Sequence, residues 1–234
     1  MIRLWGQPKY AAATGKLAGY ELFLREKQTE NGEWQLPADF SKFSPSTMAN
    51  LIGATLKTLP QDFELVSFNL DQEQFIDEAY TTLLVAVQAQ LDYALVIELT
   101  ERRGIGRKTI QLDDLITAAQ RFQAVGLRVC LDDVGTGENQ TTLVDALDPY
   151  VSEYKYALQN VRGKLSLAEV AAQVTLWRER AARLHKRFAL EGFEDPEDPE
   201  DVRLIQAFSP DLVQGYYFGR PHTLPIAADF KPIN

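Results

Sequence analysis

Short apolar segments alternate with longer amphipathic stretches along this sequence, and this alternation limits the folds that the chain can adopt. Several of the apolar segments are rich in the β-branched and aromatic residues typical of buried strands. They are Phe63–Leu70, Tyr93–Leu99, Leu127–Asp132, Val151–Ala157, Arg187–Glu191 and Leu212–Tyr217. Strands separated by helices usually pair in parallel through right-handed crossovers, so the pattern predicts an α/β protein.

The stretches between these segments carry the signals that begin and end helices. Pro45 follows a serine, which places proline at the first position of a predicted helix. Leu112–Phe122 has apolar residues at helical spacing and is followed by a glycine that can end the helix. Ser166–Glu169 matches a capping box, and Pro199 follows an aspartate at the start of another predicted helix.

Two architectures fit strands that alternate with helices: an open doubly wound sheet and a closed (β/α)8 barrel. The 234 residues divide into eight units of about 29 residues, which is close to the unit length of a typical barrel. A dinucleotide-binding sheet would show a glycine-rich turn after an early strand, but the sequence after Gly104-Ile105-Gly106 continues as Arg107-Lys108. We therefore predict a TIM-like (β/α)8 barrel, formed by residues 1–234 as a single domain.

A polar residue lies at the end of each apolar segment. These residues are Asn69, Glu98, Asp132, Lys155, Glu191 and Gln214, and they lie between 23 and 36 residues apart. In a parallel barrel all strand C-termini lie on one face, which carries the active site. The same residue types also serve as ordinary helix caps and solvated loop residues. The pattern alone leaves both interpretations open.

Carboxylates that meet at one end of a barrel need positive charge nearby, because burying an unpaired charge is costly. One lysine, Lys155, cannot balance the acidic residues Glu98, Asp132, Asp133 and Glu191. The chain has one cysteine and two widely spaced histidines, so oxygen ligands for Mg²⁺ or Mn²⁺ are expected rather than a zinc cluster. Two adjacent aspartates can serve two ions, an arrangement that activates water and holds a phosphate ester.

The overall composition excludes some classes of partner. The net charge of −9 argues against binding to duplex nucleic acid, which requires a basic surface. Residues Met1–Tyr10 lack the cationic head and apolar run of a signal peptide. No apolar stretch reaches the roughly 20 residues needed to cross a bilayer. We therefore expect a cytoplasmic protein without membrane insertion.

Several short motifs occur in a fixed order over nearly the whole chain. They are Gln7-Pro8, Glu21-Leu22-Phe23-Leu24-Arg25, Glu98-Leu99-Thr100-Glu101, Asp132-Asp133-Val134-Gly135-Thr136-Gly137, Glu191-Gly192-Phe193-Glu194 and Gln214–Pro221. Together and in this order they resemble the motifs of the EAL-domain family, the cyclic di-GMP-specific phosphodiesterases. The family's Glu-Ala-Leu signature corresponds to Glu21-Leu22-Phe23 in this chain.

The resemblance implies a site with two metal ions, either Mg²⁺ or Mn²⁺. It implies that one ion is held by Glu21, Asn69, Glu98 and Asp132. It implies that a second ion is held by Asp132, Asp133 and Glu191. It also implies that Lys155 orients the attacking water and offsets the charge of the phosphate. Lys155, Glu21 and Glu191 would then carry catalysis.

The resemblance also assigns residues to the substrate, which would be cyclic di-GMP. Arg25 would hold a phosphate, because a planar guanidinium suits bidentate contact. Other residues would line the same site, namely Phe23, Glu194, Gln214 and Pro221. Glu101 would brace the loop that follows Asp133. Family members often act as dimers, so the resemblance implies a homodimer.

Three departures from the family pattern bear on activity. The family's Lys-x-Asp is Lys155-Tyr156-Ala157 here and lacks the acid. The loop after Gly137 is longer and more polar, and Phe23 enlarges an apolar position of the signature. The resemblance nevertheless implies hydrolysis of cyclic di-GMP to linear pGpG. The alternative is an inactive module that binds cyclic di-GMP or a protein partner, while the ordered motifs disfavour an unrelated metal-dependent hydrolase.

Overall fold

The computed structural model describes residues 1–100, 109–136, 141–194 and 199–224. Nine strands form one sheet within these ranges, in the order β2-β3-β4-β5-β6-β7-β8-β1-β9. The strands are β1 Ile2–Ala11, β2 Leu17–Glu26, β3 Leu65–Leu70, β4 Ala94–Leu99, β5 Arg128–Leu131, β6 Glu153–Ala157, β7 Arg187–Glu191, β8 Leu212–Gln214 and β9 His222–Thr223. Because β1 also pairs with β2, the first eight strands close into a barrel, and the predicted TIM-like (β/α)8 fold is confirmed.

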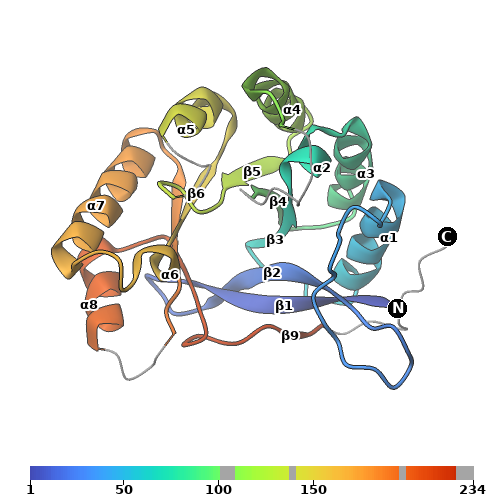
Figure 1. Ribbon diagram of the computed structural model, residues 1–234, viewed down its shortest axis with the longest axis horizontal. Helices are drawn as coiled ribbons and strands as arrows, with labels where there is room; N and C mark the ends of the chain where they lie inside the picture. Colours follow the sequence, from blue (N-terminus) through green and yellow to red (C-terminus); the bar gives the residue numbers. More distant parts are fainter. Residues whose placement is uncertain (101–108, 137–140, 195–198, 225–234) are drawn as a thin grey trace.

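The helices lie outside this barrel (Figure 1). They are α1 Pro45–Leu56, α2 Gln72–Ile76, α3 Glu78–Gln88, α4 Leu112–Ala124, α5 Thr141–Leu147, α6 Leu158–Val161, α7 Leu167–Arg183 and α8 Pro199–Phe208. The sequence signals for α1 and α7 act as expected: Pro45 is at the start of α1, and the Ser166–Glu169 capping box begins α7. Within the described ranges, no helix is long and apolar enough to cross a membrane.

The N-terminal hairpin differs from the sequence-based expectation. The apolar pattern did not indicate β1 or β2, and the expectation of parallel pairing throughout is wrong for β1. This strand runs antiparallel to both β2 and β8. The turn of residues 12–16 is too short for a parallel crossover, so β1 must reverse direction before β2. In Figure 1, β1, β2 and β9 lie on the side of the barrel opposite α4 and α5.

The barrel interior has an apolar base with a polar layer above it. The base consists of the buried residues Ala18, Leu65, Val96, Cys130, Ala189 and Leu212. Side chains alternate between the two faces of a strand, so the next interior position is two residues further along. After Leu65, Val96, Cys130, Ala189 and Leu212, those positions carry Ser67, Glu98, Asp132, Glu191 and Gln214. The strand period thus places the polar strand ends at the C-terminal mouth of a closed barrel.

Gly19 on β2 allows this strand to approach β3 closely. A Cβ atom at Gly19 would lie 1.6 Å from the carbonyl oxygen of Leu65, its register partner. We expect Gly19→Ala to lower the free energy of unfolding by about 3 kcal/mol, because the backbone of β3 must move. Urea denaturation measures this loss.

Gly53→Ala is the matched control for Gly19→Ala. A Cβ atom at Gly53, inside α1, would lie 3.7 Å from Val87, which is an ordinary contact. An alanine in a helix is favoured over glycine by roughly 0.5–1 kcal/mol, so this control should be neutral or more stable. Equal stability of the two variants would contradict the close approach of β2 and β3.

Candidate active site

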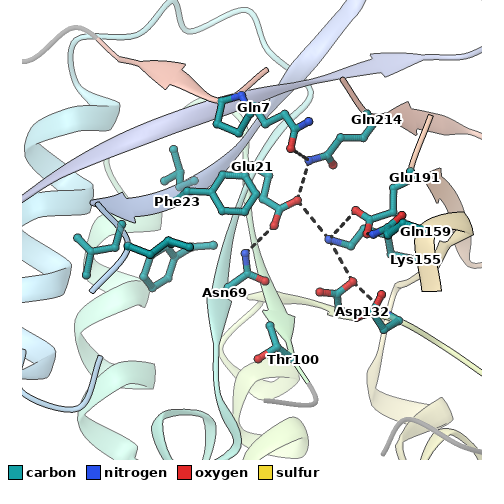
Figure 2. Close-up of a pocket in the computed structure, with 18 of the residues that line it drawn as sticks. Gln7, Glu21, Phe23, Asn69, Thr100, Asp132, Lys155, Gln159, Glu191 and Gln214 are labelled. Carbon is teal, nitrogen blue, oxygen red and sulfur yellow. Dashed lines mark hydrogen bonds and ion pairs between the residues drawn. The ribbon is translucent and has the colours of Figure 1, made fainter. Parts of the chain in front are cut away.

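A cavity of about 540 Å³ opens at the C-terminal ends of the barrel strands (Figure 2). It collects most of the site residues predicted from the sequence. Those that line it are Glu21, Phe23, Arg25, Asn69, Asp132, Asp133, Lys155, Glu191, Glu194, Gln214 and Pro221. Glu98 lies below the cavity and is fully buried. Glu101 and residues 137–140 of the altered loop lie outside the described residues.

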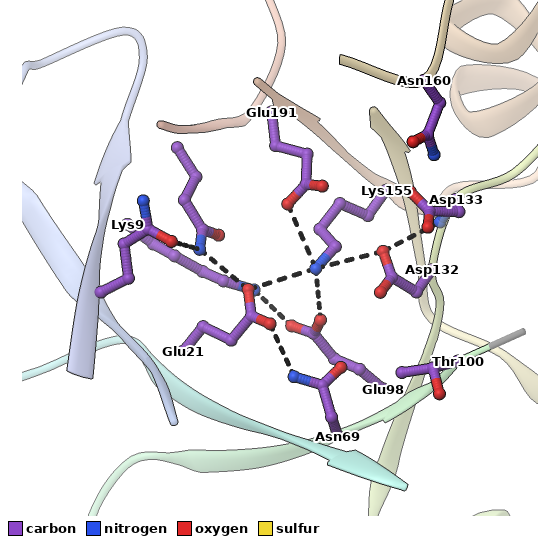
Figure 3. Close-up of polar contacts among 12 residues, drawn as sticks. Lys9, Glu21, Asn69, Glu98, Thr100, Asp132, Asp133, Lys155, Asn160 and Glu191 are labelled. Carbon is purple, nitrogen blue, oxygen red and sulfur yellow. Dashed lines mark hydrogen bonds and ion pairs between the residues drawn. The ribbon is translucent and has the colours of Figure 1, made fainter. Parts of the chain in front are cut away.

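Lys155 is the central cation of the cavity. It projects from β6, and its side chain is buried. Its Nζ lies 3.2 Å from Glu21, 2.6 Å from Glu98, 3.1 Å from Asp132 and 3.3 Å from Glu191 (Figure 3). These four carboxylates come from β2, β4, β7 and the residue after β5. Lys155 therefore holds together acidic side chains from four parts of the barrel.

Burial and these contacts together determine the pKa values of Lys155 and Asp132. Burial alone would lower the pKa of Lys155, but the surrounding carboxylates outweigh it and raise the pKa well above the ordinary value. For Asp132 burial is the larger effect and raises its pKa, although Lys155 opposes the rise. A cation bound beside Asp132 would favour its charged form.

One group of acidic residues has the arrangement of a metal site. Asp132, Asp133 and Glu191 each offer an oxygen, and within the described ranges these oxygens lie within 4.8 Å of one another. Asp133 adopts a positive φ of 54° in the turn after β5, and its N–H donates to Asp132 Oδ1 at 2.9 Å. All three ligand atoms are carboxylate oxygens, which suit hard divalent cations such as Mg²⁺ and Mn²⁺. These residues therefore fit one such ion.

Glu21 lies on the opposite wall of the cavity and is held by amide groups. Asn69 Nδ2 donates to Glu21 Oε1 at 2.6 Å, and Gln214 Nε2 donates to Glu21 Oε2 at 2.8 Å. Gln214 Nε2 also donates to Gln7 Oε1 at 3.2 Å, as Figure 2 shows. Gln214 Oε1 is buried and has no hydrogen-bond partner in the part of the chain that the structure describes. This oxygen is available to a donor group on a ligand.

Lys9 is a functional candidate that the sequence analysis missed. Its side chain is 1% exposed, and its Nζ donates to Glu98 Oε1. Burial alone would lower the pKa of Lys9, but Glu98, together with Glu21 and Glu153, outweighs it and raises the pKa. Burial would likewise raise the pKa of Glu98, but Lys155 and Lys9 hold it well below its ordinary value. Prediction of β1 as a strand would have placed Lys9 inside the barrel, two residues from Gln7.

The position of the missing acid is buried beside Glu191. Ala157 pairs in register with Glu191 across β6 and β7 and is fully buried. A polar partner for Glu191 comes instead from Gln159, whose Nε2 donates to Glu191 Oε1 at 2.6 Å. The strand-end pattern did not indicate Gln159, because this residue lies past the strand in the short helix α6.

The other end of the cavity is apolar. It is lined by Phe23, Leu36, Phe40, Met48 and Phe68. Arg25 lies at this end, with its guanidinium carbon 5.4 Å from the ring centre of Trp5 and 5.8 Å from that of Phe23. The cavity therefore combines an acidic centre, which can hold a cation, with an apolar wall suited to a flat ring and a guanidinium suited to an anion.

The sequence profile described as the EAL domain matches residues 2–221 of this chain. No curated protein is significantly similar in sequence. A solved EAL domain protein from Listeria monocytogenes EGD-e has a TM-score of 0.76 and 23% identity, over 96% of this chain and 89% of that chain. The Bacillus subtilis YkuI protein, with an EAL domain, in complex with substrate c-di-GMP and calcium, has a TM-score of 0.75 and 16% identity, over 96% of this chain and 57% of that one.

Two further solved structures have the same fold. The PaMucR phosphodiesterase in complex with c-di-GMP has a TM-score of 0.71 and 20% identity, over 95% of this chain and 97% of that chain. The EAL enzyme Bd1971 in its cAMP- and cyclic-di-GMP-bound form has a TM-score of 0.73 and 21% identity, over 95% of this chain. This chain spans 62% of the length of Bd1971. At these identities the structural likenesses establish the fold.

Proposed function

We propose that this chain, which belongs to the EAL domain family, is a metal-dependent phosphodiesterase that hydrolyses cyclic di-GMP to linear pGpG. The observation that carries the proposal is the group of Asp132, Asp133 and Glu191 beside the buried Lys155, inside a cavity with an apolar wall. Such a cavity offers a place for a cation, for phosphate charge and for a planar base. The solved complexes of PaMucR and YkuI with c-di-GMP support this choice of ligand.

In this proposal Asp132, Asp133 and Glu191 hold a divalent cation, Mg²⁺ or Mn²⁺. When bound, such an ion polarises a phosphoryl oxygen and lowers the pKa of a bound water. Gln159 orients Glu191 through the 2.6 Å hydrogen bond between them. The second ion that the resemblance implies would require Glu21, Asn69, Glu98 and Asp132.

The other residues of the cavity bind and orient the substrate. Lys155 stays protonated and donates to oxygens of the attacking water and of the phosphoryl group, which offsets charge in the transition state. Arg25 binds a phosphate, and Phe23 packs against a guanine base. Gln214, Glu194 and Pro221 complete the substrate surface.

The reaction replaces one phosphorus–oxygen bond by another. The oxygen of water attacks one phosphorus in line, the bond from that phosphorus to the 3′ oxygen breaks, and the 3′ oxygen takes up a proton. The product is linear pGpG, with the second phosphodiester intact. The charged centre of the cavity would hold the phosphate, and its apolar wall would hold a base. Fixing both parts of the substrate favours the in-line geometry.

Product analysis tests the proposal directly. Purified protein incubated with cyclic di-GMP and Mn²⁺ is expected to release pGpG, and EDTA is expected to stop the release. Glu21→Ala should remove most of the activity, because Glu21 bridges Lys155, Asn69 and Gln214. Absence of pGpG with either metal at every protein concentration would contradict an enzymatic function.

Ala157 favours a second candidate function, a module that binds cyclic di-GMP without hydrolysis. An acid that the family carries is replaced there by a methyl group in a fully buried position. This function predicts that cyclic di-GMP raises the melting temperature while no pGpG forms. A homodimer and a cytoplasmic location stay predictions from the sequence.

A further inference from the structure

Lys9 enters the acidic centre from the side opposite Lys155. It lies on β1, the antiparallel strand, where it pairs in register with Gly19 on β2 and with Gln214 on β8. Its side chain is 1% exposed, and its ammonium group reaches across the barrel to Glu98. Figure 3 shows Lys9 and Lys155 meeting the same carboxylate.

Both oxygens of Glu98 already have an ammonium partner. Lys9 donates to Oε1, and Lys155 donates to Oε2 at 2.6 Å. Glu98 itself is fully buried, so water does not compete for these oxygens. A metal ligand must offer a carboxylate lone pair to the ion, and each ammonium group competes for that lone pair.

Both carboxylate oxygens of Glu21 likewise accept hydrogen bonds from protein groups. Its Oε1 accepts from Asn69, and its Oε2 accepts from Gln214 and from Lys155. Two ammonium groups, those of Lys9 and Lys155, already contact Glu98, and Lys155 also contacts Glu21. A divalent cation added beside Glu21, Asn69 and Glu98 would lie close to both ammonium groups and would be repelled by them.

Asp132 and Glu191 contact Lys155, at 3.1 Å and 3.3 Å, but this is one ammonium group rather than the two that meet Glu98. The oxygens of Asp132, Asp133 and Glu191 converge within 4.8 Å, and Glu191 is partly exposed at the mouth of the cavity. Among the described residues, Lys9 forms an ion pair with Glu98 and none with Asp132, Asp133 or Glu191. In the part of the chain that the structure describes, Asp132, Asp133 and Glu191 form the group whose carboxylate oxygens are close enough together to hold one metal ion.

We infer that Lys9 takes the place of one of the two metal ions, so that this chain binds a single divalent cation at Asp132, Asp133 and Glu191. The inference rests on the proposed metal-dependent function. In it, the Lys9 ammonium is a permanent cation that neutralises Glu98 and blocks an ion at Glu21, Asn69 and Glu98. Lys9 is thus a determinant of metal stoichiometry, and it acts through Glu98 without touching the substrate.

Mn²⁺ titration of the purified chain tests this inference by calorimetry and electron paramagnetic resonance. The wild-type chain is expected to bind one Mn²⁺ per chain and to give the spectrum of an isolated ion. Lys9→Met removes the ammonium and keeps an unbranched apolar side chain. It is expected to bind two Mn²⁺ ions, with affinity for the second increased by at least about 100-fold, because the repulsion is lost. Two ions roughly 3.5–4 Å apart give a magnetically coupled spectrum.

Two further variants keep the test decisive. Lys9→Gln retains a hydrogen-bond donor for Glu98 without the charge, and it is expected to fold and to bind a second Mn²⁺ even if Lys9→Met does not fold. Lys16→Met removes an exposed lysine from the turn between β1 and β2, and it is expected to bind one Mn²⁺ like the wild type.

The outcomes separate this inference from the proposed function. Two Mn²⁺ ions bound to the wild type together with pGpG release would overturn the role of Lys9 and leave the phosphodiesterase standing. One ion in the wild type and two in the Lys9 variants, without pGpG, would support the role of Lys9 and contradict the phosphodiesterase. A Lys9 variant that folds and still binds one ion would overturn the inference, as would a wild type that binds none.

Discussion

Asp132→Asn is expected to lower kcat for pGpG release by about 1,000-fold or more, equivalent to ~4 kcal/mol of transition-state stabilisation. Asp132 contacts Lys155 at 3.1 Å and belongs to the acidic group beside Asp133 and Glu191. Asparagine keeps the shape of the side chain but removes the charge that would bind a divalent cation. Initial rates at saturating cyclic di-GMP, with Mn²⁺ or Mg²⁺, measure the effect.

Asp62→Asn is the matched control for this change. Asp62 is exposed and lies outside the cavity, so the control should keep the wild-type kcat. Mn²⁺ affinity, measured alongside, should fall for Asp132→Asn and stay constant for Asp62→Asn. A kcat within tenfold of the wild type for Asp132→Asn would show that catalysis does not depend on this carboxylate.

Lys155→Met is expected to destabilise the metal-free protein by ~3–5 kcal/mol, because removal of the cation from a buried charge network leaves its carboxylates with less compensating positive charge. Its ammonium group contacts four carboxylates, of which Glu98 is the most deeply buried. For a chain of this size, such a loss lowers the melting temperature by roughly 6–20 °C. Thermal unfolding in EDTA measures the effect.

Added Mn²⁺ distinguishes this electrostatic cause from a simple packing defect. Carboxylates that have lost their ammonium partner should bind a divalent cation more tightly, and a ligand that binds only the folded state stabilises it. Mn²⁺ should therefore raise the melting temperature of Lys155→Met more than that of the wild type. Lys57→Met, at an exposed position, should behave like the wild type. An equal or smaller Mn²⁺ shift in Lys155→Met would rule out the electrostatic explanation.

The barrel could be predicted from the sequence because its parallel strands are short, apolar and regularly spaced. The segments predicted around Phe68, Ile97 and Leu190 became β3, β4 and β7 with boundaries shifted by a few residues at most. β8 ends at Gln214 rather than at Tyr217, because the chain turns at Gly215. The hairpin of β1 and β2 escaped prediction, because its interior positions carry polar residues.

Most of the candidate site could also be predicted, since the polar strand ends share one face of the barrel. The sequence motifs and the strand-end pattern identified Glu21, Asn69, Asp132 and Glu191, which line one cavity in the structure. Spacing could not reveal which cation neutralises which carboxylate. That depends on contacts across the barrel, such as the contact of Lys9 with Glu98, whose positions are 89 residues apart.

Closure of the barrel by β1 and β8 sets the order in which a newly made chain can complete the cavity. Gln7 and Gln214 are hydrogen-bonded but lie 207 residues apart, and Lys155 meets Glu21 across 134 residues. Contacts between such distant residues are slow to form, because the intervening chain must first be ordered. On the ribosome, β1 must wait until residues 12–211 have been made before its partner β8 emerges. The hydrogen bond between Gln7 and Gln214, and the wall of the cavity that it joins, therefore form only once the barrel is closed.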